Sequence, residues 1–246
     1  NIQKPSFHSH DIAQLTDNPS GLQKLQKLLK KTYGINKGDL DLITGGPPCQ
    51  GFSGIGHRRN YGLERKKLPY NFLYKKMIKV IDYFQPKIFL FENVKGLTTA
   101  RWTKKGKKGE IFKDVLNSFS NLNNYYQFSD ILYAKDYGVP QNRPRIFIVG
   151  IRKNLNFFPE FGKKAWGLLP ENSYSSYPDP VDLFSDLIDP QYLNSLETKY
   201  YLSNPKNKIQ KEFRSKKKLD LVLKKGDLLD EQKYTKHSNF IIKKFI

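Results

Sequence analysis

Apolar residues between Gly38 and Gly150 alternate between short continuous runs and longer stretches with helical spacing. Short apolar runs bounded by turn residues are typical of buried strands, whereas apolar positions three or four residues apart indicate amphipathic helices. This alternation predicts an α/β domain built on a mostly parallel sheet. The predicted strands are residues 40–44, 87–91 and 145–149, the predicted helices are 71–84 and 111–122, and an extended stretch covers 125–137.

The pattern changes after about Phe158. Prolines, serines and tyrosines accumulate there, and the later segments are rich in lysine with weak periodicity. This composition favours a second module with an irregular fold. We therefore predict two domains, residues 1–158 and 159–246, with a boundary near Pro159.

The formal net charge of +20 comes from 43 basic and 23 acidic residues. Such an excess favours a polyanionic partner, first of all nucleic acid, because phosphate contacts release counterions. The lysine bias also fits an AT-rich coding genome, which weakens this argument. The sequence shows neither an apolar run of membrane-spanning length nor a signal peptide, so we expect a soluble cytoplasmic protein.

The single cysteine, Cys49, lies on a turn directly after the first predicted strand. With four scattered histidines it gives no zinc-ligand spacing, so we expect no structural metal. In an open α/β sheet, ligands bind at the edge where such a turn lies. The turn Gly45–Pro48 combines glycines that allow close approach with prolines that restrict the backbone. A lone cysteine is more often a small buried apolar residue, so the surrounding motif has to decide its role.

Three short motifs resemble those of the DNA (cytosine-5)-methyltransferase family. Pro48-Cys49-Gln50 resembles the nucleophile loop, Glu92-Asn93-Val94 resembles the Glu-Asn-Val motif, and residues 141–145 resemble the Gln-x-Arg-x-Arg motif. Their joint occurrence in this order makes the resemblance specific to this family. The resemblance implies a Rossmann-like core that depends on S-adenosylmethionine. Residues 159–246 then occupy the position of a smaller, irregular target-recognition domain.

The resemblance assigns a chemical role to each motif. Cytosine C5 is a poor nucleophile, so the thiolate of Cys49 first adds at C6. Glu92 hydrogen-bonds or protonates N3, and Arg145 stabilises the charge at O2 with Arg143 beside it. A cytosine in duplex DNA must rotate out of the helix to be reached. The glycines and basic residues of 51–71 are typical of a loop that closes on DNA.

The methyl donor that the family implies is S-adenosylmethionine. Asp11-Ile12, after His10, resembles the segment whose aspartate contacts the adenine, and Gly46 and Pro48 lie where backbone faces the donor. Leu73 resembles a position that packs on the cofactor, although a core role fits equally well. A glycine-rich Phe-x-Gly-x-Gly motif is absent from the sequence. We therefore expect a preceding segment or a second chain to supply it.

Three functions fit these motifs. The first is a DNA cytosine-5 methyltransferase, either part of a microbial restriction–modification system or an orphan enzyme. The second is a transfer RNA methylase of the same fold, and the third is an inactive DNA-binding remnant. Gly51-Phe52-Ser53 after the nucleophile motif resembles the DNA-modifying members. The joint presence of Cys49, Glu92 and Arg145 argues against an inactive remnant.

Overall fold

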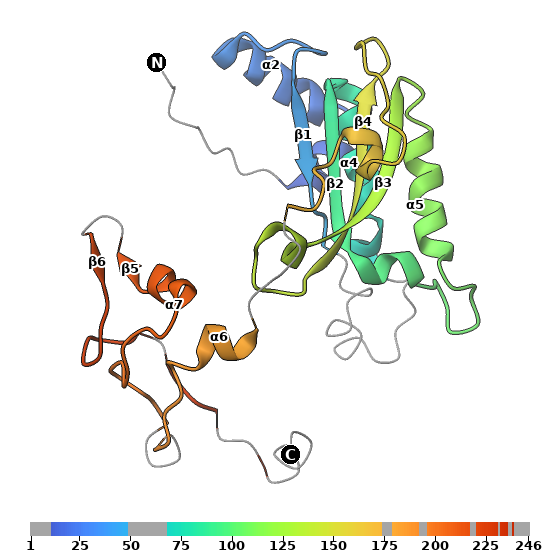
Figure 1. Ribbon diagram of the computed structural model, residues 1–246. Coiled ribbons are helices and arrows are strands. Elements are labelled where there is room, and N and C mark those ends of the chain that lie inside the picture. Colours follow the sequence, from blue (N-terminus) through green and yellow to red (C-terminus); the bar gives the residue numbers. More distant parts are fainter. Residues whose placement is uncertain are drawn as a thin grey trace. The chain divides into compact units, whose positions relative to one another are not determined.

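The chain folds as two compact units, Asn1–Ser175 and Ser176–Ile246. The structure is a computed structural model, and Figure 1 shows the elements of each unit. The described residues are 11–48, 68–173, 179–191, 196–216, 220–230, 232–235 and 238.

The first unit is built around a four-stranded sheet of order β1-β2-β4-β3 (Figure 1). β1 pairs parallel with β2, whereas β4 runs antiparallel to both β2 and β3. The expected mostly parallel sheet is therefore wrong for these strands. Residues 134–143, which join β3 to β4, are too few for a crossover connection, so the two strands form a hairpin. The strands are β1 (Leu42–Gly45), β2 (Ile88–Val94), β3 (Tyr125–Tyr133) and β4 (Pro144–Arg152).

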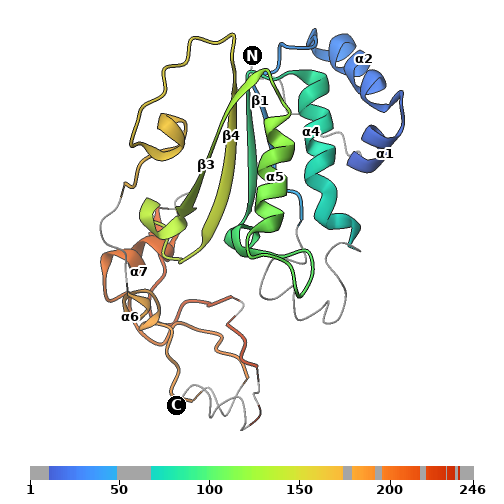
Figure 2. The ribbon, with the colours of Figure 1, turned by 90° about the vertical axis from the view of Figure 1, so that its right-hand side faces the viewer.

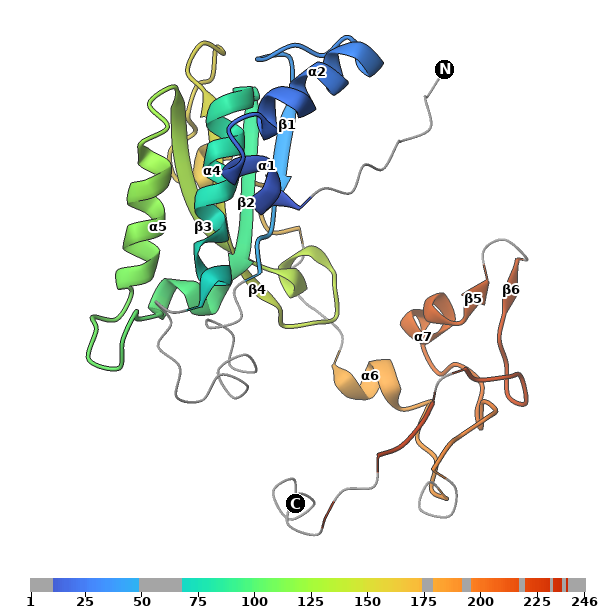
Figure 3. The same ribbon diagram turned by 180° about the vertical axis from the view of Figure 1, so that it is seen from behind.

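Helices α4 and α5 cover one face of this sheet, as two further views show (Figures 2 and 3). Their apolar stripes meet the alternate strand residues Phe89 and Phe91, and Phe119 of α5 packs on both rings. Helical spacing of apolar residues thus predicted both helices correctly. The helices are α1 (Ile12–Asp17), α2 (Gly21–Tyr33), α4 (Leu73–Phe84) and α5 (Glu110–Ser120), with 3-10 turns η2 (Pro69–Phe72), η3 (Lys95–Thr99), η4 (Ala134–Tyr137) and η5 (Lys164–Gly167).

The opposite face of the sheet is covered by the segment around η5. Ala165 and Leu169 are buried there against Val149 of β4, and the backbone N–H of Ala165 donates to Asp130 of β3. This packing joins residues beyond Phe158 to the first unit. The structural division at Ser175–Ser176 therefore lies later in the chain than the change of pattern in the sequence.

The second unit has little regular structure. Helix α6 (Pro180–Phe184), helix α7 (Lys208–Phe213) and the short antiparallel pair β5 (Ser215–Lys216) and β6 (Leu221–Val222) are its elements in the described residues. None of the helices in the described parts of either unit has the length and apolar character that spanning a membrane requires.

Candidate active site

One edge of the sheet gathers the described parts of all three sequence motifs. β1, β2 and β3 end at this edge, and β4 begins there because it runs in the opposite direction. The turn 45–48, residues 92–94 and residues 141–145 are therefore neighbours in space although they are far apart in sequence. We call this the carboxyl edge. Cys49 itself lies outside the described residues, as does most of the expected basic loop.

Glu92 and Arg145 form an ion pair at this edge. In the register of β2 and β4, Glu92 lies opposite Phe147 and Arg145 lies opposite Val94, so both charged side chains share one face of the sheet. Arg145 Nε lies 2.8 Å from Glu92 Oε1, with 19% and 34% of the two side chains exposed. Sequence reasoning assigned both residues to the same cytosine, and the structure places them in direct contact. Arg145 thus holds the Glu92 carboxylate in place, and the carboxylate remains accessible to solvent.

The turn before Cys49 packs directly on this carboxylate. A Cβ atom added at Gly46 would lie 2.9 Å from Glu92 Oε2, so a side chain there would displace the carboxylate. A Cβ atom at Gly45 would lie 2.8 Å from the sulfur of Met77 in α4. The two glycines therefore allow the turn to lie close against side chains of β2 and α4, and a larger residue at either position would have to move one of these side chains.

Asn93 holds the same turn from the other face of β2. Its Nδ2 donates to the carbonyl of Pro47 at 3.1 Å, and its Oδ1 accepts from the N–H of Val94 at 2.8 Å. The Asn93 side chain is buried. The middle residue of the motif thus fixes the backbone that leads to Cys49. Sequence analysis assigned Asn93 no role, although its place in the motif was the available signal.

Lys95 and Tyr133 add a second polar contact at the carboxyl edge. Lys95 Nζ donates to Tyr133 Oη at 2.6 Å. Lys95 follows β2 directly, and Tyr133 lies opposite Pro144 in the register of β3 and β4. Because Leu132, and not Tyr133, lies opposite Arg145, the register places Tyr133 on the other face of the sheet from the Glu92–Arg145 pair. Sequence analysis missed both residues, because only the strand pairing brings them together.

Arg143 lies on the exposed turn that precedes β4. Its N–H donates to the carbonyl of Gln141 at 2.9 Å, and its carbonyl accepts from Ala134 at 3.2 Å. Within the described residues, no hydrogen bond or ion pair joins its side chain to the Glu92–Arg145 pair. The structure thus places Arg143 near the edge by its backbone.

The candidate cofactor residues lie on neighbouring elements. Asp11 caps α1, since its Oδ1 accepts from the N–H of Ala13 at 2.7 Å, and Ile12 is the first residue of that helix. Leu73 begins α4 and is half-buried. The two helices are joined by the Lys76–Asp17 ion pair. The hydrogen bond from Lys76, with its charge, holds the pKa of the Asp17 carboxyl below its usual value.

The fold and the site at its edge define the class of protein as a Rossmann-like α/β methyltransferase core. The chain belongs to the C-5 cytosine-specific DNA methylase family, whose family model matches residues 4–245. The resemblance carried by the three motifs is thereby confirmed.

Two curated relatives illustrate this membership. The Type II methyltransferase M.DdeI of Desulfomicrobium norvegicum is 34% identical over 86% of this chain and 46% of its own length. The Type II methyltransferase M.HpaII of Haemophilus parainfluenzae is 34% identical over 71% of this chain and 47% of its own length. The chain thus spans less than half the length of these relatives. The solved S. pombe Dnmt2 methyltransferase is 23% identical, with a TM-score of 0.35 over 61% of this chain and 38% of that one.

Proposed function

We propose that this chain carries the catalytic residues of a DNA cytosine-5 methyltransferase that serves a microbial restriction–modification system. The supporting observation is the Glu92–Arg145 pair, fixed against the turn that leads to Cys49. The relatives M.DdeI and M.HpaII, both named Type II methyltransferases, support the same assignment. The enzyme acts on double-stranded DNA in the cytoplasm and remains at the nucleoid through DNA binding.

The reaction begins when the Cys49 thiolate adds to C6 of a cytosine rotated out of the duplex. Addition moves negative charge to N3 and O2 of the ring. The carboxyl group of Glu92 then hydrogen-bonds or protonates N3, in an orientation that Arg145 sets. A guanidinium has five N–H donors, so Arg145 can hold Glu92 through Nε and also donate to O2. Arg143, on the adjoining turn, supports this group.

S-adenosylmethionine, when bound, supplies an electrophilic methyl group to C5. We assign its binding to Asp11, Ile12, Gly46, Pro48 and Leu73. The residue types fit, because Asp11 offers an exposed carboxylate, Ile12 and Leu73 offer apolar surface, and Gly46 brings the backbone of the turn close to Glu92. Since the chain spans less than half of its relatives, a further segment or a second chain completing this pocket is part of the proposal.

Exchange of the C5 hydrogen tests the residues of this chain without the methyl donor. When the thiolate adds at C6, C5 takes a proton from water, and loss of the original hydrogen with elimination of the thiolate restores cytosine. Duplex DNA labelled with tritium at cytosine C5 should therefore release tritium to water. Cys49→Ala should abolish release, and Glu92→Gln should slow it by about 10²–10³-fold.

Asp41→Asn is the matched control for Glu92→Gln. Asp41 is an exposed carboxylate with its own cation, Lys87, at the opposite edge of the sheet, so its loss should leave exchange unchanged. Release of tritium from Cys49→Ala at the normal rate would contradict the covalent mechanism. Release from transfer RNA but not from DNA would instead make the chain an RNA methylase. A duplex containing 5-fluorocytosine then tests the donor, because a denaturation-resistant adduct should form only with S-adenosylmethionine present.

A further inference from the structure

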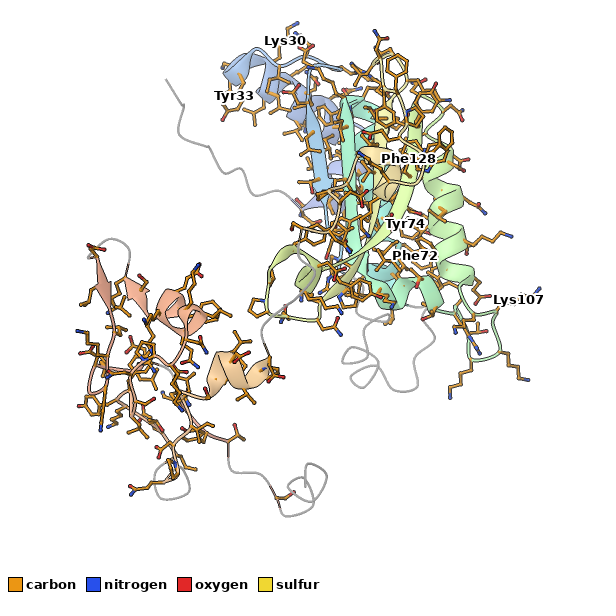
Figure 4. All side chains as sticks on the ribbon, viewed as in Figure 1. Lys30, Tyr33, Phe72, Tyr74, Lys107 and Phe128 are labelled. Carbon is orange, nitrogen blue, oxygen red and sulfur yellow. The ribbon has the colours of Figure 1, made fainter. Side chains whose placement is uncertain are left out.

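The connection between η3 and α5 carries four lysines within five positions. These residues are Lys104, Lys105, Lys107 and Lys108, and we call them the lysine loop. All four are exposed, and none forms an ion pair with another described residue. The loop follows β2 and precedes α5, so it lies at the carboxyl edge that carries the Glu92–Arg145 pair. Figure 4 shows Lys107 extending outward from it.

The loop is held from inside by one carboxylate. Glu110 Oε1 accepts from the backbone N–H of Trp102 at 2.5 Å, and Oε2 accepts from that of Lys107 at 3.0 Å. Gly106 lies so close to this carboxylate that an added Cβ atom would be 2.1 Å from Oε1. The Glu110 carboxylate therefore accepts hydrogen bonds from backbone N–H groups of the loop, whereas the lysine side chains extend to solvent. Their positive charge is left available to a partner.

Trp102 anchors the loop to the rest of the unit. The indole is 7% exposed, and its Nε1 donates to Asp114 Oδ2 at 2.5 Å. Its ring stacks on Phe72, with the centroids 5.0 Å apart and the planes inclined by 11°. Phe72 lies a few residues after the segment that contains Cys49 and directly before α4. The lysine loop is thus attached to the element at which the chain returns from the nucleophile motif.

We propose that the lysine loop binds the phosphate backbone of DNA beside the cytosine that enters the active site. This inference rests on the proposed function and adds a DNA contact to it. Lysine contacts to phosphate position a protein on the duplex without reading its sequence. A loop already held by Glu110 and Trp102 loses less conformational entropy on binding than a free lysine run would. The expected ligand is therefore a phosphate backbone of any sequence.

A salt series of DNA-binding measurements tests the proposal. We compare the whole chain with a variant in which Lys104, Lys105, Lys107 and Lys108 are all replaced by Gln, using fluorescence anisotropy of a labelled duplex. Each lost phosphate contact reduces the slope of log Kobs against log salt by about 0.9. If two to four contacts are lost, the slope should become shallower by about 2–4. Affinity at low salt should fall by about 10–10³-fold. Replacement of the four lysines by Arg should preserve the slope.

The matched control removes the same charge from the other edge of the sheet. Lys24, Lys27, Lys30 and Lys31 are exposed on α2, which leads into the start of β1. Figure 4 shows Lys30 at this opposite edge of the unit. Their replacement by Gln should leave the slope nearly unchanged. Equal loss of slope in the two variants would overturn the proposal, because net charge alone would then explain it.

Tritium exchange separates this proposal from the proposed function. At saturating DNA the lysine-loop variant should exchange the C5 hydrogen at the normal rate, since Cys49, Glu92 and Arg145 are unchanged. Its half-saturating DNA concentration should rise by the factor seen in the binding assay. A normal half-saturating concentration would overturn the loop proposal while the function stands. Loss of exchange and of DNA binding in the unmodified chain would overturn both.

Discussion

The two units of this protein differ in what fills their interiors. In the first unit the buried centre is apolar, with Phe89, Phe91 and Phe119 at most 1% exposed. Among the described residues of the second unit the most deeply buried groups are polar, and Arg214 and Asp186 are only 3% and 4% exposed. Apolar residues at helical or strand spacing predict an apolar interior from the sequence. A buried ion pair between residues far apart in sequence gives no such pattern.

The polar interior of the second unit depends on complete pairing. Arg214 donates through Nε and Nη2 to Asp186 Oδ2 and through Nη1 to the carbonyl of Ser203. Its guanidinium also lies 3.8 Å from the centroid of the Tyr201 ring. Burial raises the pKa of the Tyr201 hydroxyl, although Arg214 opposes this effect. A buried charge is tolerated only when an opposite charge and hydrogen bonds offset its loss of hydration. The Arg214–Asp186 pair and its hydrogen bonds therefore hold this unit together.

The largest expected effect follows from breaking that pair. Arg214→Met leaves the Asp186 carboxylate buried without a partner, which should destabilise the second unit by about 3–5 kcal/mol. Both tryptophans of the chain, Trp102 and Trp166, lie in the first unit and report only its unfolding. Hydrogen exchange should therefore accelerate in residues 179–230 while the tryptophan transition stays in place.

The matched control replaces both charges. Asp186→Leu with Arg214→Met removes the uncompensated charge and should recover most of the lost protection, because an apolar pair has no desolvation penalty. If the single and the double variant exchanged equally fast, the ion pair would not be what holds the second unit.

A smaller effect is expected from overpacking the apolar interior. A Cβ atom at Gly150 would lie 2.0 Å from the ring of Phe89. Gly150→Ala should therefore destabilise the first unit by about 1–3 kcal/mol, measured as a shift of the tryptophan unfolding midpoint in urea. Adding Phe89→Leu should relieve the clash and recover part of the loss. An unchanged midpoint in Gly150→Ala would contradict the close contact between β2 and β4.

The smallest effect concerns a polar group inside the apolar unit. Tyr125 Oη donates to the carbonyl of Pro86 at 2.7 Å, and burial raises the pKa of this hydroxyl to about 12. The folded state keeps this proton when the unfolded state has lost it. The contribution of this group to the free energy of unfolding is fully present below about pH 10, the ordinary pKa of tyrosine. It declines as the pH rises from about 10 to about 12, because only the unfolded state then loses the proton.

Tyr125→Phe tests this group by urea unfolding at several pH values. The variant should be less stable by about 1 kcal/mol at pH 7, because the Pro86 carbonyl loses its donor. Its decline between pH 10 and 12 should be shallower than that of the unmodified chain. An equally steep decline would assign the alkaline loss of stability to other tyrosines, such as Tyr74, whose pKa burial also raises.

Much of the first unit could be predicted from local sequence patterns. The predicted helix 71–84 corresponds to η2 and α4, and the predicted strand 87–91 is the first part of β2. β2 continues to Val94 because its last residues pair with the start of β4, which no local pattern contains. The helix α2 was not predicted, although its leucines recur at helical spacing, at positions 22, 25, 28 and 29.

The sequence by itself determined which residue types carry the chemistry, because the three motifs depend only on residue identity and order. It also determined most elements of the first unit, because apolar periodicity is a local property of the chain. Only the tertiary structure decided that β4 runs antiparallel to β2 and that Glu92 contacts Arg145. It likewise decided that Asn93 holds the Pro47 carbonyl and that Arg214 pairs with Asp186. These contacts depend on strand register and packing between residues distant in sequence, which no local pattern encodes.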